Sequence, residues 1–249
     1  MGNDSNGDLF AANLCEYGVE THLIRGNAPT GCTMMFPQDN GIPGTFIVSI
    51  GAAGEFLKGD ISLEILNGYE YLHVEGFLLN CGDIAEYVLH SAHERGIIIS
   101  FDLGSKGVVD RHRKRVERIV EQYADIVFAN ENEAVEFIGN SGKIGAEGIA
   151  AKMHNGGIAA VKMGSAGSVL ACGNFVCPVA PHPVQVVDTL GAGDAYAAGF
   201  LYAHSRGASL QRCGEAASIT AAGAVGVPGP KIDKDIWETV KVSLQGIAL

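Results

Sequence analysis

The feature that most constrains the fold is a regular alternation of short apolar runs with helical patterns between residues 71 and 164. The apolar runs have the length and composition of buried strands: YLHVEG at 71–76, IIISFD at 97–102, DIVFAN at 125–130 and IAAVKMG at 158–164. Helical patterns lie between these runs, at 81–96, 108–123, 131–138 and 145–157. Strands that alternate with helices build right-handed crossovers in a parallel sheet. The sequence therefore predicts an α/β fold with a doubly wound, mainly parallel sheet and helices on both faces.

Ligands of such folds bind beyond the carboxyl ends of the strands. The polar residues and glycine at those ends are therefore the first candidates for a site: Glu75, Asp102, Asn130, Lys162 and Gly164. Each also has an ordinary explanation. Asp102 is typical of a turn, Lys162 of a solvated strand end, and Glu75 of a residue paired with a neighbour in the sheet.

The pattern differs on either side of this region. A helix is predicted at 8–17, followed by strand-like runs at 21–24, 32–36 and 45–50, with the hairpin signal Asn40-Gly41 between the last two. These runs predict a small antiparallel element within about residues 20–52. After residue 164 we expect a hairpin at 168–179, a strand at 183–188, a helix from residue 195 to 204, another over 209–225 and a last amphipathic helix. Residues 1–249 are predicted to form a single domain.

The charge of the chain indicates which partners are unfavourable, and its cysteine content indicates the compartment. The chain has 17 Lys and Arg against 28 Asp and Glu, a formal net charge of −11, which disfavours nucleic acid and anionic membranes as partners. The basic run at 111–118 lies within a helical pattern and is interpreted as a solvated helix face. The first ten residues have neither a basic start nor an apolar core, so we expect no secretory signal, and six scattered cysteines suit a reducing compartment. We expect a cytoplasmic protein.

The motif with most chemical content is DTLGAGD at 188–194, just before a helical pattern. Its glycines free backbone amides to face a ligand, and the N-terminus of the following helix favours an anion. A carboxylate beside such an anion hole suits proton removal from a hydroxyl during phosphoryl transfer. Asp194 is then the candidate base, and the amides from Gly191 through Ala192 and Gly193 to Asp194 form the hole. GAGD alone is more typical of an ordinary helix start with Asp194 as cap.

The longer string DTLGAGDAYAAGF at 188–200 resembles the second signature of the ribokinase-like (PfkB-type) family of sugar and nucleoside kinases. FANENEA at 128–134 resembles the family's Asn-x-x-Glu element. AVKMGSAGSVL at 160–170 resembles its segment that contacts ATP, with Lys162 where the family often has Thr. PTG at 29–31 and SIGAA at 49–53 resemble its lid region. The likeness covers nearly the whole chain and is nearest the adenosine kinase-like branch.

The resemblance implies that ATP and Mg²⁺ lie along the carboxyl edge of the sheet. It implies an ATP-dependent phosphotransferase in which Asp194 activates a hydroxymethyl group of a sugar or nucleoside, and a homodimer formed through the lid. The resemblance implies nucleotide binding for six further residues: Asn130, Glu133, Lys162, Gly164, Gly167 and Gly229. It implies that Asn130 and Glu133 bind Mg²⁺ through water and that the backbone of Asp188 and Leu190 binds K⁺. It also implies that Glu75 binds the acceptor. Taken separately, Asn130 and Glu133 are typical of a helix cap and a first-turn carboxylate.

One part of the family pattern is not found in this sequence. The opening strand with its substrate-binding Asp, and the Gly-Gly…Asn element that grips the acceptor, have no counterpart ahead of the family's GDDxxG segment, which resembles GNDSNG at 2–7. Lost acceptor contacts would weaken the positioning of the hydroxyl. A start recorded too late, a partner that supplies the segment and a decayed enzyme are three explanations. The alternative function is a catalytically impaired or non-catalytic nucleotide-binding relic.

Overall fold

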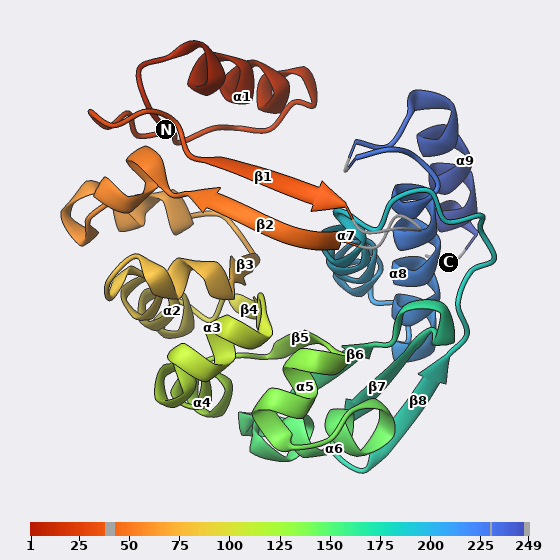
Figure 1. Ribbon diagram of the computed structural model, residues 1–249. Helices are drawn as coiled ribbons and strands as arrows, with labels where there is room; N and C mark the ends of the chain where they lie inside the picture. The colour runs from red at the N-terminus through yellow and green to blue at the C-terminus, as the bar shows by residue number, and fades with distance from the viewer. Residues whose placement is uncertain (38–42, 230, 247–249) are drawn as a thin grey trace.

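The computed structural model describes residues 1–37, 43–229 and 231–246, and its centre is a mixed six-stranded sheet (Figure 1). The strands follow one another in chain order across the sheet. The first four are parallel and the last two antiparallel: β3 (Tyr71–Glu75), β4 (Ile98–Asp102), β5 (Ile126–Asn130), β6 (Ile158–Lys162), β7 (Ser168–Cys172) and β8 (Phe175–Val179). The predicted α/β fold is confirmed.

Helices cover both faces of this sheet because its strands are apolar on both sides. In β5, Val127 and Ala129 belong to one hydrophobic core and Ile126 and Phe128 to the other, as the period of two along a strand requires. The first core is closed by the helices that connect the parallel strands: α2 (Ile84–Glu94), α3 (Lys106–Arg111), α4 (Arg113–Gln122), α5 (Glu131–Ile138) and α6 (Gly142–Lys152). The second is closed by α7 (Ala192–Ser205), α8 (Leu210–Val225) and α9 (Lys234–Gln245).

The N-terminal part consists of α1 (Ser5–Glu16) and an antiparallel pair, β1 (Cys32–Pro37) and β2 (Pro43–Ser49). The predicted lid strands at 32–36 and 45–50 are thus present, and Asn40-Gly41 lies outside the described residues. The strand expected at 21–24 does not form. The carbonyl of Ile24, at the end of this run, instead accepts a hydrogen bond from the amino group of Met1 at 2.9 Å.

Two further sequence expectations are corrected. Residues 183–188 are not a strand. The N–H groups of Val187 and Asp188 both donate to the carbonyl of Val225, so this segment is hydrogen-bonded to the end of α8 and not to the edge of a sheet. The single helix expected over 108–123 is two helices, α3 and α4, which meet at His112.

The basic run on α3 and α4 is partly structural. Arg115 pairs with Glu86 of α2 and donates to the carbonyl of Leu79, and Arg113 donates to the carbonyls of Glu136 and Phe137 at the end of α5. The interpretation of this run as a solvated face is therefore incomplete, because two of its arginines hold neighbouring elements together. Across the described ranges, no helix has the length and apolar character needed to cross a membrane.

Candidate active site

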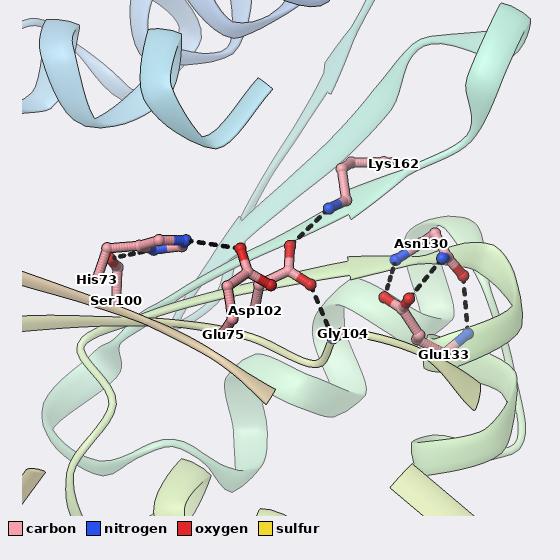
Figure 2. A network of polar contacts seen from close by, with 8 residues as sticks. All are labelled: His73, Glu75, Ser100, Asp102, Gly104, Asn130, Glu133 and Lys162. Atoms are coloured by element: carbon pink, nitrogen blue, oxygen red, sulfur yellow. Dashed lines mark hydrogen bonds and ion pairs between the residues drawn. The ribbon is translucent and has the colours of Figure 1, made fainter. Parts of the chain in front are cut away.

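The ends of the parallel strands bring the polar residues to one edge of the sheet. Glu75 of β3 lies opposite Asp102 of β4, and Asn130 of β5 lies opposite Lys162 of β6. Figure 2 shows the contacts that these side chains make. All four residues end a parallel strand, as the sequence pattern predicted, and their roles in a site stay predictions.

Asp102 and Lys162 form an ion pair across the intervening strand. The Lys162 Nζ lies 2.7 Å from Asp102 Oδ2, and the two side chains are only 16% and 9% exposed. Asp102 Oδ1 also accepts the N–H of Gly104 at 2.8 Å. Burial disfavours the charged ammonium, but the hydrogen-bonded Asp102 carboxylate, together with the carboxylates of Glu133 and Glu75, outweighs burial and raises the pKa of Lys162. Lys162 is therefore not the solvated lysine that its sequence context favours, whereas Asp102 makes the turn contact that its context favours and also holds Lys162.

Glu75 is held by a histidine that sequence analysis did not single out. His73 Nε2 lies 3.1 Å from Glu75 Oε1, and its Nδ1 lies 2.8 Å from the hydroxyl of the buried Ser100. His73 and Ser100 each stand two residues before a strand-end acid, Glu75 and Asp102, and therefore share its face of the sheet. This two-residue spacing is the sequence pattern that could have identified His73 and Ser100.

Asn130 and Glu133 form a reciprocal cap at the start of α5. Glu133 accepts the backbone N–H of Asn130 at 2.7 Å and its side-chain amide at 2.6 Å, while the Asn130 amide oxygen accepts the N–H of Glu133. The ordinary structural explanation of this pair is thus correct as geometry. Glu133 is nevertheless buried, and burial, with the nearby Asp102 carboxylate, raises its pKa to about 7. A carboxyl perturbed this far is a functional candidate.

The GAGD turn places Asp194 in the first turn of α7. Gly191 precedes the helix with φ of 80°, a conformation that favours glycine. Burial raises the pKa of Asp194 above its usual 3.8, and the carboxylates of Glu75 and Asp102 add to this, whereas Lys162 opposes it. The base candidate, the strand-end acids and the lysine therefore belong to one electrostatic cluster.

Asp188 ties this turn to the loop after α8. One carboxylate oxygen accepts the N–H of Leu190 at 2.9 Å, and the other accepts the N–H of Gly229 at 3.0 Å. These backbone donors hold the pKa of Asp188 below its usual value. The roles suggested for the backbone of Asp188 and Leu190 and for Gly229 stay predictions.

A cavity of about 520 Å³ opens beside these residues. Its polar end includes Asn130, Lys162, Ala192 and Gly193, and its apolar end is formed by Val184, Val186 and residues of α8. The remaining lining residues include Gly164, Gly167, Ser168, Thr189, Tyr196 and Ser218. Glu75, Glu133, Asp194 and Gly229 lie outside its lining.

Comparison with known proteins identifies the family of the chain. Residues 1–237 match the pfkB family of carbohydrate kinases. An uncharacterized sugar kinase of Archaeoglobus fulgidus is 28% identical over 228 residues, covering 89% of this chain and 87% of the relative. A nucleoside kinase of Methanothermobacter thermautotrophicus is 31% identical over 253 residues, covering 97% and 76%. The crystal structure of adenosine kinase from Sinorhizobium meliloti superposes with a TM-score of 0.89 at 27% identity, covering 98% and 76%. The chain thus belongs to the pfkB family of carbohydrate kinases, and it is a sugar or nucleoside kinase.

Proposed function

We propose that the chain transfers the γ-phosphate of ATP to a hydroxymethyl group of a sugar or nucleoside, with Asp194 as the general base. The observation that carries this proposal is the Asp194 carboxyl in the first turn of α7, directly after the Gly191–Gly193 turn and within the electrostatic cluster of Glu75, Asp102 and Lys162. Its raised pKa makes it a better proton acceptor than an ordinary aspartate. The N–H of Ala192 donates to the carbonyl of Thr189, but N–H groups at the start of a helix generally lack a partner within it and favour the negative charge of the transferred group.

The nucleotide fits the 520 Å³ cavity in size and polarity. The phosphates belong at its polar end, beside Lys162 and Gly193, and the base belongs between Val184, Val186 and α8. The Thr189 hydroxyl oxygen lies buried at this cavity and has no hydrogen-bond partner among the described residues, as a group that awaits a ligand would. Gly164 and Gly167 turn the chain at the rim with positive φ.

Magnesium follows from the charge of the site. The site holds four carboxyl groups: Glu75, Asp102, Glu133 and Asp194. The charges of Glu75 and Asp102 raise the pKa values of Glu133 and Asp194, and the Lys162 ammonium lowers them. A polyphosphate would be repelled without a further cation. In the described part of the chain, no three or more His, Cys, Asp or Glu side chains cluster as metal ligands. Mg²⁺ usually keeps several waters, and we assign the orientation of these waters to Asn130 and Glu133. We also assign K⁺ to the backbone carbonyls of Asp188 and Leu190.

We place the acceptor hydroxyl between Asp194 and Glu75, whose carboxylate His73 holds in place. A nucleoside is favoured over a hexose, since a nucleoside kinase and an adenosine kinase are among the similar proteins. We also propose a cytoplasmic location, because all six cysteines are free thiols and reducing compartments keep them so.

A turnover assay tests this function. The 249-residue chain is given ATP, Mg²⁺ and K⁺ with pooled nucleosides and then pooled sugars, and the phosphorylated product is identified by mass spectrometry. We expect one product phosphorylated at a hydroxymethyl group, and a lower rate when choline replaces K⁺. ATP binding without any product across both pools would instead support the alternative, a nucleotide-binding relic of the fold.

The lid supports a homodimer. Met34 and Ile47 lie opposite each other in the β1–β2 pair and are 57% and 59% exposed, and such an apolar patch is typical of an interface. We expect sedimentation equilibrium to give about twice the 26.0 kDa of one chain. Ile47→Lys should give the single-chain mass, whereas Leu57→Lys, at an exposed position outside the hairpin, should leave the dimer intact. A dimer that survives Ile47→Lys would contradict this interface.

A further inference from the structure

Lys162 is placed more specifically than nucleotide binding alone requires. It ends β6, reaches past β5 and meets Asp102 on β4, so that its ammonium is fixed at 2.7 Å from a buried carboxylate (Figure 2). A long lysine side chain at a strand end is otherwise free to sample many rotamers. This ion pair therefore fixes where the positive charge lies.

The Lys162 ammonium lies against the first turn of α7. A Cβ built on Gly193 would come within 3.3 Å of the Lys162 Nζ. Gly193 is inside α7 and does not share the positive φ of Gly191, so a side chain at this position would crowd the ammonium without straining the backbone. Lys162 and Gly193 also line the same cavity.

A cation at a helix N-terminus is unfavourable by itself, because the positive end of the helix dipole lies there. The arrangement becomes favourable when an anion lies against both groups. Asp102 offsets the charge of Lys162 and binds the ammonium, which the carboxyl groups of Glu133 and Asp194 also attract. A lysine that paired with Asp194 instead would compete with the proton that the base must accept.

We propose that Asp102 is a positioning residue that holds the Lys162 ammonium over Gly193, where it stabilises the phosphoryl group during transfer more than it stabilises the bound nucleotide. This inference rests on the proposed function, since it needs a phosphoryl group to pass this turn. During transfer the oxygens of the moving group approach the first turn of α7, and a prealigned charge acts there without reorganisation. No bond is formed to Lys162.

A double-mutant cycle in turnover tests the coupling of the two residues. Lys162→Met should lower kcat by about 10²-fold, within the range known for one lost transition-state donor, and change the KM for ATP by less than about threefold. Asp102→Asn should lower kcat by about tenfold, and the same change in the Lys162→Met background should lower it much less, because only the influence of Asp102 on the pKa of Asp194 remains there. An equal loss in both backgrounds would show that Asp102 acts independently of Lys162 and would overturn the proposal.

A binding measurement tests the same idea without turnover. Calorimetry compares Mg·ADP alone with Mg·ADP plus aluminium fluoride, a planar mimic of a phosphoryl group in transfer. The protein should bind the fluoride complex more tightly than Mg·ADP. Lys162→Met and Asp102→Asn should abolish most of that gain and leave Mg·ADP affinity within about threefold. Loss of Mg·ADP affinity itself would make Lys162 a ground-state ligand and contradict the inference.

Two controls keep these results interpretable. Lys114→Met, at an exposed lysine of α4, should preserve both kcat and the fluoride gain. The double variant leaves no unpaired buried charge, so it should fold even if Lys162→Met does not, and its fluoride gain should be absent. A protein that shows the fluoride gain but phosphorylates no acceptor would contradict the proposed function, and it would leave the role of Lys162 standing.

Discussion

Replacing Asp194 with Asn should lower kcat by about 10²–10⁴-fold, the usual contribution of a general base. Asn keeps the size of the side chain in the first turn of α7 but cannot accept the proton of the acceptor hydroxyl. Mg·ADP affinity should be unchanged or slightly higher, because a negative charge beside the phosphates is removed. Steady-state kinetics with the acceptor from the pooled assay and calorimetry with Mg·ADP measure the two effects.

The pH dependence of the unmodified protein gives an independent check of the same base. Below its pKa, Asp194 is protonated and cannot accept a proton, so kcat/KM should fall on the acid side. Since burial and the nearby Glu75 and Asp102 carboxylates raise this pKa, the fall should begin above the ordinary 3.8. Asp235→Asn, at an exposed position of α9, should leave both the rate and the profile unchanged. Full turnover by Asp194→Asn would show that another group is the base.

Sequence patterns predicted the parallel half of the sheet because the information there is local. Each of the runs that became β3, β4, β5 and β6 is a buried strand next to its own connecting helix, so length and apolar content suffice. Residues 183–188 failed for the opposite reason. Their valines match a strand, but their backbone partner is the carbonyl of Val225, and no local pattern reveals a partner so distant in the chain.

The candidate site divides in the same way. Asp194, Asn130 and Glu133 were predictable because each belongs to a short motif at a helix start, which the structure forms at α7 and α5. His73 and Ser100 were not, since a polar residue inside a strand acquires meaning only from its neighbours in register. The pairing of Asp102 with Lys162 depends on two residues from strands that are not adjacent, which their separate sequence contexts do not indicate.

Glu133→Gln should change stability and activity in opposite directions. The folded protein keeps the Glu133 proton up to a pH of about 7, whereas 4.5 is the ordinary value for the unfolded chain. Folding is therefore progressively disfavoured as the pH rises through this window, by about 3 kcal/mol once the carboxyl is ionised. Gln has no such ionisation, but it cannot accept both N–H groups of Asn130, and the lost hydrogen bond costs about 1 kcal/mol.

Urea unfolding across the pH range should therefore show a crossover between the two proteins. At pH 4 the Gln variant should be less stable than the unmodified protein by about 1 kcal/mol, and at pH 8 more stable by about 2 kcal/mol. Glu94→Gln, at the exposed end of α2, should show no crossover. A constant difference at all pH values would mean that Glu133 ionises in the folded protein as it does in the unfolded chain.

The activity of the same variant decides why an unfavourable carboxylate is kept at this position. If Glu133 orients the water shell of Mg²⁺, its replacement should lower kcat by about 10–100-fold, as loss of an outer-shell group does, and raise the Mg²⁺ concentration needed for half the maximal rate. A variant that is more stable at pH 8 and nearly inactive would show that the buried charge is maintained for the cation rather than for the fold. Unchanged kinetics with raised stability would instead make Glu133 only the cap of α5 and remove it from the magnesium site.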